Sequence, residues 1–119
     1  MIKGIGTDII EIERIKQAVN EHGTKFLNRI FTKRELAYCE KRGKLRFPEL
    51  SVRFAAKEAY SKALGTGMKG IKWNEIEVLN NDLGKPHIAL KGKIMRNIHV
   101  SLSHSANSAN AIVIIEETK

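Results

Sequence analysis

The sequence predicts an α+β fold: an N-terminal strand, a helical block with one long central helix, and then a C-terminal antiparallel meander. Apolar residues recur at helical spacing through most of the first half, and they alternate at strand spacing through much of the second. Turns rich in glycine and asparagine separate the later segments. With 119 residues and no linker or repeat, we expect one domain spanning residues 1–119.

Residues 1–10 are predicted to form the first strand, in which isoleucines alternate with small or polar residues. Because side chains alternate across a strand, Gly4, Gly6 and Asp8 should share one face. Two glycines weaken a strand, so they indicate close approach of another backbone or of a ligand. Asp8 has two interpretations: it ends the strand and caps the next helix, or it is a ligand presented at a strand end.

Three shorter helices should follow. An amphipathic pattern covers residues 11–21, and a shorter apolar pattern covers residues 24–30. Thr32 and Glu35 have the spacing of a capping box, which predicts a third helix that ends near Gly43.

The central helix is predicted to start between Pro48 and Ser51, to include the run of helix formers at residues 53–64 and to end at a left-handed C-terminal cap at Gly65. One broad apolar face consists of Ala55, Ala56, Ala59, Tyr60, Ala63 and Leu64. The opposite side is expected to carry Lys57, Glu58, Ser61 and Lys62. Because most of the apolar face is small, another element should pack closely against it.

Glu58 and Lys62 lie four residues apart, which is typical of an ordinary ion pair on a helix surface. The functional interpretation is that Glu58 and Asp8 bind the same metal ion. A Mg²⁺ site needs only one or two carboxylates, together with substrate phosphates and water. Spacing in the sequence does not show whether these two carboxylates meet.

The second half should form strands. Residues 73–79 alternate as a strand, and residues 87–90 pair back with them across a tight turn. Residues 99–104 alternate cleanly, and residues 109–115 form an apolar run suited to a buried strand. Residues 91–98 have no clear pattern.

Charge favours a polyanionic partner. The chain has 21 Lys and Arg against 13 Asp and Glu, a net charge of +8. Such a charge suits nucleic acid, a phosphate-rich cofactor, an anionic membrane or an acidic protein. Because there are only one Trp, two Tyr and four Phe, a base-stacking platform is less favoured.

The single cysteine, Cys39, excludes an internal disulfide and suits a small core position in a reducing compartment. With neither a long apolar run nor a signal-peptide pattern, the chain is expected to be cytoplasmic. The four histidines show no zinc-ligand spacing, and Ser/His catalysis and a P-loop also lack their motifs.

Four segments resemble, in order and spacing, the bacterial holo-[acyl-carrier-protein] synthases, which are short 4′-phosphopantetheinyl transferases. These segments are Gly4–Ile15, Arg53–Gly67, Gly84–Pro86 and Leu102–Ser105. The resemblance implies transfer of the 4′-phosphopantetheine arm of coenzyme A to a serine of an apo acyl carrier protein, with release of adenosine 3′,5′-bisphosphate. It also implies Mg²⁺ dependence and a homotrimer with active sites between subunits.

The resemblance assigns roles by motif position. Asp8 and Glu58 correspond to Mg²⁺ ligands, and with Lys62, near the pyrophosphate, they form the catalytic set. The base for the carrier serine is either Glu58 or a metal-bound water. The residues expected to bind coenzyme A are Lys44, Arg46, Arg53, Ser61, Gly65, Pro86 and His104. The residues expected to receive the acidic carrier protein are Arg14, Lys25, Phe26 and Arg29.

A rival interpretation is a small basic nucleic-acid-binding module without catalysis. The net charge favours it, whereas the scarce aromatics and the two carboxylates among phosphate-friendly groups oppose it. The resemblance favours the transferase, with neither nucleic acid nor membrane as a partner.

Overall fold

A computed structural model describes residues 1–118 as five helical segments and eight strands. In chain order these are β1 (Ile2–Glu11), α1 (Ile12–His22), α2 (Thr24–Ile30), α3 (Lys33–Cys39), β2 (Glu40–Lys41), β3 (Lys44–Leu45), α4 (Phe47–Leu64), the 3₁₀ turn η1 (Trp73–Glu75), β4 (Ile76–Asn80), β5 (Pro86–Leu90), β6 (Lys93–Ile94), β7 (Ile98–His104) and β8 (Ser108–Glu116). None of the helices described there has the length and apolar character needed to span a membrane.

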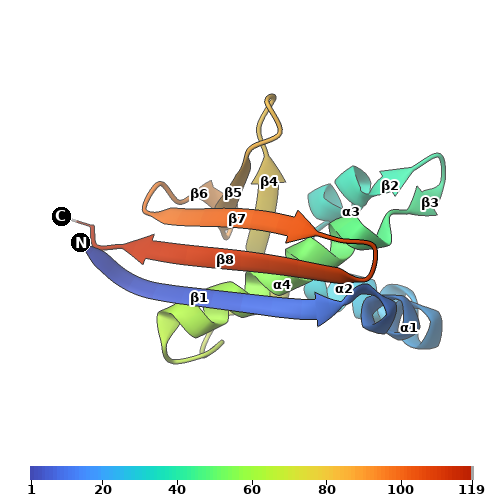
Figure 1. The fold of residues 1–119 in the computed structure, drawn as a ribbon. Helices are drawn as coiled ribbons and strands as arrows, with labels where there is room; N and C mark the ends of the chain where they lie inside the picture. Colours follow the sequence, from blue (N-terminus) through green and yellow to red (C-terminus); the bar gives the residue numbers. More distant parts are fainter. Residues whose placement is uncertain (119) are drawn as a thin grey trace.

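The N-terminal strand joins the C-terminal strands in one antiparallel sheet of order β1-β8-β7 (Figure 1). Asp8 lies opposite Ala111 of β8, which lies opposite Leu102 of β7. The other late strands form a separate sheet, β4-β5-β6. The predicted α+β class is confirmed, although the late strands divide between two sheets rather than forming one meander.

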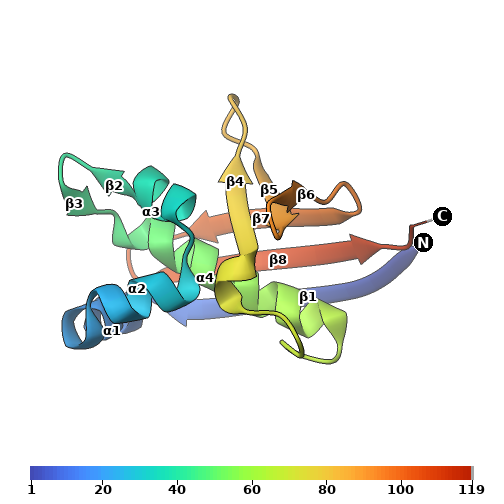
Figure 2. The same cartoon turned by 180° about the vertical axis from the view of Figure 1, so that it is seen from behind.

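Helix α4 crosses one face of the β1-β8-β7 sheet, as the view from behind shows (Figure 2). Its alanine-rich face is buried, and it packs in one core cluster with Ile76 and Val78 of β4 and with Val113 of β8. The small side chains therefore let the helix lie close to the sheet, as the sequence predicts. Figures 1 and 2 show no element over the opposite face of this sheet within residues 1–118.

The two glycines of β1 lie directly against the backbone of α4. A Cβ atom added to Gly4 would lie 2.0 Å from the carbonyl oxygen of Ala63, and one added to Gly6 would lie 2.0 Å from that of Ala59. These glycines thus permit close approach of strand and helix, as predicted. Asp8 is the next residue on the same face of β1, so it is held near the C-terminal half of α4.

Gly6→Ala should destabilise the protein by about 1–3 kcal/mol or more, because the obstructing atom belongs to helix backbone and cannot rotate away. Urea unfolding would measure this loss. Thr7→Ala is a control on the opposite face of the strand; it loses one hydrogen bond to Ala111 and should cost about 1 kcal/mol. Equal stability of native and Gly6→Ala protein would contradict the close contact.

Several element boundaries differ from the sequence-based expectation. Helix α3 ends at Cys39 rather than near Gly43, because the chain there turns into the β2–β3 hairpin. Helix α4 begins at Phe47, one residue before the expected range, with Pro48 in its first turn. Trp73 begins a 3₁₀ turn and the strand starts only at Ile76. Residues 91–98, which had no assignment, contain the short strand β6.

The prediction that Lys57 lies on the outer side of α4, opposite the apolar face, is wrong. This side chain is fully buried and forms an ion pair of 2.6 Å with Glu35, which is also fully buried. Helix α4 is covered by the sheet on one side and by α1, α3 and β4 elsewhere, so its polar residues do not mark a single solvent face. Cys39 is buried, as expected.

Candidate active site

The three predicted catalytic side chains meet where β1 crosses α4. The ammonium of Lys62 donates hydrogen bonds to the Asp8 carboxylate at 3.0 Å and to the carbonyl oxygen of Thr7 at 3.1 Å. Within residues 1–118, Glu58 forms no ion pair with Lys62, so the expected helix-surface pair is replaced by a pair between strand and helix. Asp8 does not cap α1 either, because the N-cap residue is Glu11.

Glu58 lies close enough to Asp8 for their charges to interact. Partial burial raises the pKa of Glu58, the negative charge of Asp8 raises it further, and the positive charge of Lys62 opposes both effects. Two carboxylates and one ammonium therefore share a small region. Such a region favours an added cation, because a cation relieves the repulsion between the carboxylates.

Asp8 and Glu58 also line one pocket of about 360 Å³, with Arg14 of α1 and Phe26 of α2 on its walls. Phe54 lines the same pocket and stacks on Trp73, with ring centroids 6.1 Å apart. Two residues of the expected carrier surface thus adjoin the two carboxylates.

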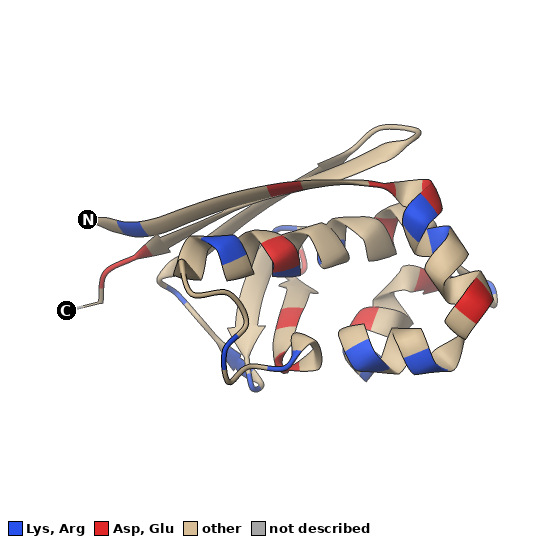
Figure 3. Cartoon of the chain, turned by 90° about the horizontal axis from the view of Figure 1, so that it is seen from below, with Lys and Arg blue, Asp and Glu red and all other residues tan. Residues whose placement is uncertain are grey.

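The remaining two residues of the expected carrier surface, Lys25 and Arg29, are exposed on α2. Figure 3 colours the charged positions and shows both basic and acidic residues on the short helices at this end of the molecule. Arg14, Lys25 and Arg29 therefore place positive charge on the helical end beside the carboxylate pocket.

The expected coenzyme A residues fall into two separate groups. Ser61 and Gly65 are in the last turn and the C-terminal cap of α4, close to Lys62 in the sequence. Arg46 and His104 line a larger pocket of about 1080 Å³, and Pro86 and His104 line another near the β7 edge of the sheet. Lys44 is exposed on β3 nearby. None of these pockets includes Asp8 or Glu58, so the chain does not bring the whole set together.

Arg53 differs from an exposed phosphate-binding arginine. Its guanidinium is buried, donates to the Glu49 carboxylate at 3.2 Å and to the side chain of Asn80, and lies 4.4 Å from the centre of the Tyr38 ring. Arg46 also contacts this ring, at 5.2 Å. Arg53 therefore supports the floor of the pocket that Tyr38, Asn80 and Glu49 line.

Sequence reasoning missed Tyr38, Phe54 and Lys57. Tyr38 had no signal that would separate it from an ordinary aromatic residue. Lys57 did have one: it follows Leu50 and Phe54 by seven and three residues, which places it on an apolar stripe of the helix.

Comparison with known proteins identifies the family. A profile of the 4′-phosphopantetheinyl transferase superfamily matches residues 4–115. The chain belongs to this superfamily. The holo-[acyl-carrier-protein] synthase of Clostridium botulinum is 50% identical over 123 residues, which covers 98% of each chain. The expected likeness to these synthases is thereby confirmed.

Solved structures of superfamily members share the fold. The holo-(acyl-carrier-protein) synthase of Bacillus anthracis, in complex with CoA (3′,5′-ADP), matches with a TM-score of 0.84 and 41% identity over 99% of both chains. The Helicobacter pylori synthase in complex with coenzyme A matches with a TM-score of 0.81 and 30% identity, covering 94% of this chain and 99% of that one.

Proposed function

We propose that this chain transfers 4′-phosphopantetheine from coenzyme A to a serine hydroxyl of an apo acyl carrier protein. The observation that carries the proposal is the meeting of Asp8, Glu58 and Lys62 where β1 crosses α4. The superfamily match and the relatives named as holo-[acyl-carrier-protein] synthases support the same reaction. The coenzyme A complexes of two similar proteins support the donor.

The reaction exchanges a phosphoanhydride bond for a phosphoester bond. The serine oxygen forms a bond to the phosphorus that carries the pantetheine arm, and the bond from that phosphorus to the bridging pyrophosphate oxygen breaks. Adenosine 3′,5′-bisphosphate leaves with the bonding electrons, and the serine loses its proton to a base. Such a transfer depends mainly on positioning and on neutralising charge. The Lys62 ammonium would offset the charge that grows on the leaving group.

The donor set suits Mg²⁺. Carboxylate oxygens are hard ligands, and Mg²⁺ commonly takes one or two of them while phosphates and water supply the rest. Although residues 1–118 contain no cluster of three or more acidic, histidine or cysteine ligands, Asp8 and Glu58 satisfy this smaller need. The raised pKa of Glu58 fits, because a bound cation would replace the repulsion from Asp8 with attraction. When bound, Mg²⁺ would neutralise charge on the pyrophosphate oxygens.

The direct test is incubation of the protein with coenzyme A, Mg²⁺ and an apo acyl carrier protein, followed by intact-mass measurement. The carrier should gain one phosphopantetheine group, and adenosine 3′,5′-bisphosphate should appear in equal amount. A carrier whose serine is replaced by alanine should gain nothing. An unmodified native carrier, with folded protein and all reagents present, would contradict the proposed reaction.

The active form is proposed to be a homotrimer with sites between subunits. The free face of the β1-β8-β7 sheet, which is the face that α4 does not cover, has large apolar side chains exposed on it. Ile5 is 59% and Ile9 is 70% exposed, and Ile112 lies beside them on β8. A patch of this kind favours contact with a further protein surface. Contact between copies would also let the catalytic residues around Asp8 on one subunit face the expected coenzyme A residues Pro86 and His104 on another.

We therefore expect light scattering to give the mass of three chains, and Ile5→Asp to shift the protein toward monomer with loss of transfer. Thr118→Asp, which adds the same charge away from the free sheet face, serves as the control. A native protein that is both monomeric and fully active would contradict the assembly.

The exposed face of α1 and α2 is proposed to dock the acidic carrier. Charge reversal by Arg14→Glu or Arg29→Glu should weaken carrier binding on the order of tenfold and flatten its salt dependence, while affinity for coenzyme A stays nearly native. Arg96→Glu, a reversal after β6 on another part of the surface, is the matched control. Equal losses of affinity for carrier and coenzyme A would contradict the assignment.

A further inference from the structure

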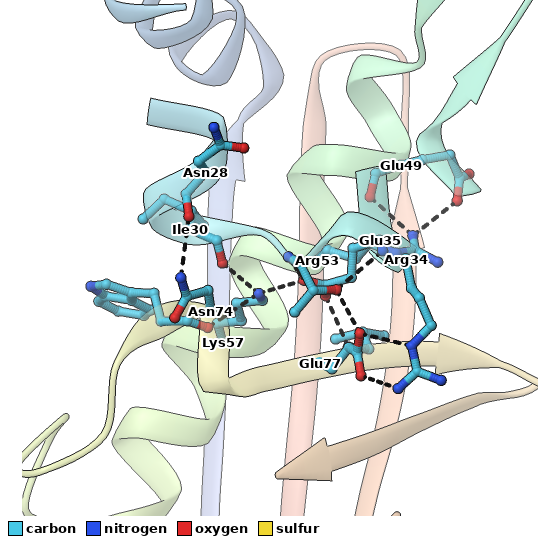
Figure 4. Close-up of polar contacts among 12 residues, drawn as sticks. Asn28, Ile30, Arg34, Glu35, Glu49, Arg53, Lys57, Asn74 and Glu77 are labelled. Carbon is cyan, nitrogen blue, oxygen red and sulfur yellow. Dashed lines mark hydrogen bonds and ion pairs between the residues drawn. The ribbon is translucent and has the colours of Figure 1, made fainter. Parts of the chain in front are cut away.

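A buried polar cluster lies beneath the proposed carrier-docking helix (Figure 4). Its centre is the Lys57 ammonium, which donates to the Glu35 carboxylate at 2.6 Å, to the carbonyl oxygen of Ile30 at 2.6 Å and to that of Trp73 at 3.2 Å. All three ammonium hydrogens can thus be used, and each acceptor lies on a different element. These elements are α3, the end of α2, and η1.

Glu35 is equally well satisfied. One carboxylate oxygen accepts from Lys57 and from the backbone N–H of Thr32, and the other accepts from the backbone N–H of Val78. Burial lowers the pKa of Lys57, and the Glu35 charge opposes that shift. Because burying two charges is costly, a pair of apolar residues of similar size would often give a fold at least as stable. The pair therefore invites an explanation other than stability.

The position of Lys57 in α4 supplies that explanation. The next residue is Glu58, whose carboxylate lines the proposed metal pocket. Lys57 itself caps the last carbonyl of α2 and lies 5.2 Å from the ring centre of Phe31. Phe31 makes an edge-to-face contact with Phe26, at 6.4 Å between centroids, and Phe26 lines the same pocket as Glu58. Neighbouring residues of one helix thus reach the catalytic carboxylate and the base of the docking helix.

We propose that Lys57, held by Glu35, is a positioning residue that fixes the carrier-docking helix α2 relative to the Glu58 carboxylate. A seven-residue helix has little stability of its own, so its placement depends on such contacts. The cationic cap at its C-terminus also complements the helix dipole. A second tether lies beside it, because the Asn74 side chain donates to the carbonyl oxygen of Asn28 at 3.2 Å.

The inference rests on the proposed role of α2 as the carrier-docking element. The test variant is Lys57→Met/Glu35→Gln, which removes both charges together and leaves one amide oxygen to accept from one of the two backbone N–H groups that Glu35 holds. Asn74→Ala is a milder variant that loosens α2 without touching the buried pair. Arg34→Met is the control: it breaks a neighbouring pair with Glu77, at 2.6 Å between α3 and β4, and within residues 1–118 this pair has no hydrogen bond or ion pair to α2.

For the double variant and for Asn74→Ala we expect the KM for apo carrier protein to rise, on the order of tenfold for the double variant, because small displacements of a docked substrate are costly. The KM for coenzyme A should stay native. Amide hydrogen exchange should quicken in residues 24–31 while α4 stays protected. Arg34→Met should leave both KM values and the α2 exchange rates native, even where its melting temperature falls.

Native carrier KM and native α2 exchange in the folded double variant would overturn the inference, since the pair would then be structural only. A parallel rise in both KM values would also overturn it. Arg29→Glu separates this failure from that of the docking proposal. If Arg29→Glu raises the carrier KM and the double variant does not, only the positioning role fails. If Arg29→Glu has no effect, the docking surface and the positioning role both fail.

Discussion

Glu58→Gln should lower the transfer rate on the order of a hundredfold or more at saturating coenzyme A and carrier, the scale for losing one strong transition-state contact. The substitution keeps the side-chain shape but removes an anionic ligand from the pair with Asp8. Asp8→Asn should have a similar effect. Glu117→Gln, at an exposed position after β8 and away from the proposed site, is the matched control and should keep its native rate. Near-native rates in folded Glu58→Gln and Asp8→Asn would remove both residues from the reaction.

Although Glu58→Gln should lower the transfer rate, it should leave the stability of the fold unchanged or raise it. Because the pKa of Glu58 is raised in the fold, its ionised form is unfavourable there, so without divalent metal the variant should melt at or above the native temperature at pH 7. The native protein should regain this difference as the pH falls through the raised pKa and then below the ordinary value of 4.5, where Glu58 is protonated in both the folded and the unfolded state. A variant that melts well below the native protein at pH 7 would contradict this account.

Lys57→Met should cost about 3–5 kcal/mol of unfolding free energy, because it leaves the Glu35 carboxylate buried without its cation. This is a large share of the roughly 5–15 kcal/mol that holds an ordinary domain together. Urea unfolding, monitored by the fluorescence of Trp73, would measure the change. The carbonyl groups of Ile30 and Trp73 would lose their donor as well.

The double variant Lys57→Met/Glu35→Gln separates charge from packing. It should recover much of the lost stability, since neither side chain then carries an uncompensated charge. Lys62→Met is a second comparison, because the Lys62 side chain is 56% exposed and its loss should cost under about 1 kcal/mol. If Lys57→Met and Lys62→Met lowered the free energy of unfolding by the same small amount, the prediction that losing Lys57 leaves a costly buried charge would be contradicted.

Local patterns predicted much of the fold because their causes are local. The capping box of Thr32 and Glu35 forms as the spacing predicts, and Gly65 adopts the left-handed cap with a φ of 78°. The glycines of β1 predicted close contact with another backbone or a ligand, and the structure identifies the backbone of α4 as the contact. These features follow from sterics and hydrogen bonding within a few residues.

What the sequence could not supply depends on contacts between distant segments. Asp8 and Glu58 are fifty positions apart, and only the packing of β1 on α4 brings them together. The end of α3 at Cys39 has no glycine or proline to mark it. Lys57 looked exposed because a charge usually is, and only Glu35 and two distant carbonyls make its burial tolerable.

Calorimetric titration of Mg²⁺ into the protein with coenzyme A bound tests the central claim most directly, because it measures the metal site apart from turnover. The native protein should bind one ion per active site. Glu58→Gln and Asp8→Asn should each bind more weakly, and the variant with both changes should show no binding above that of coenzyme A alone, while all three still bind coenzyme A. Native Mg²⁺ affinity in the variant with both changes would contradict the assignment of Asp8 and Glu58 as the ligands.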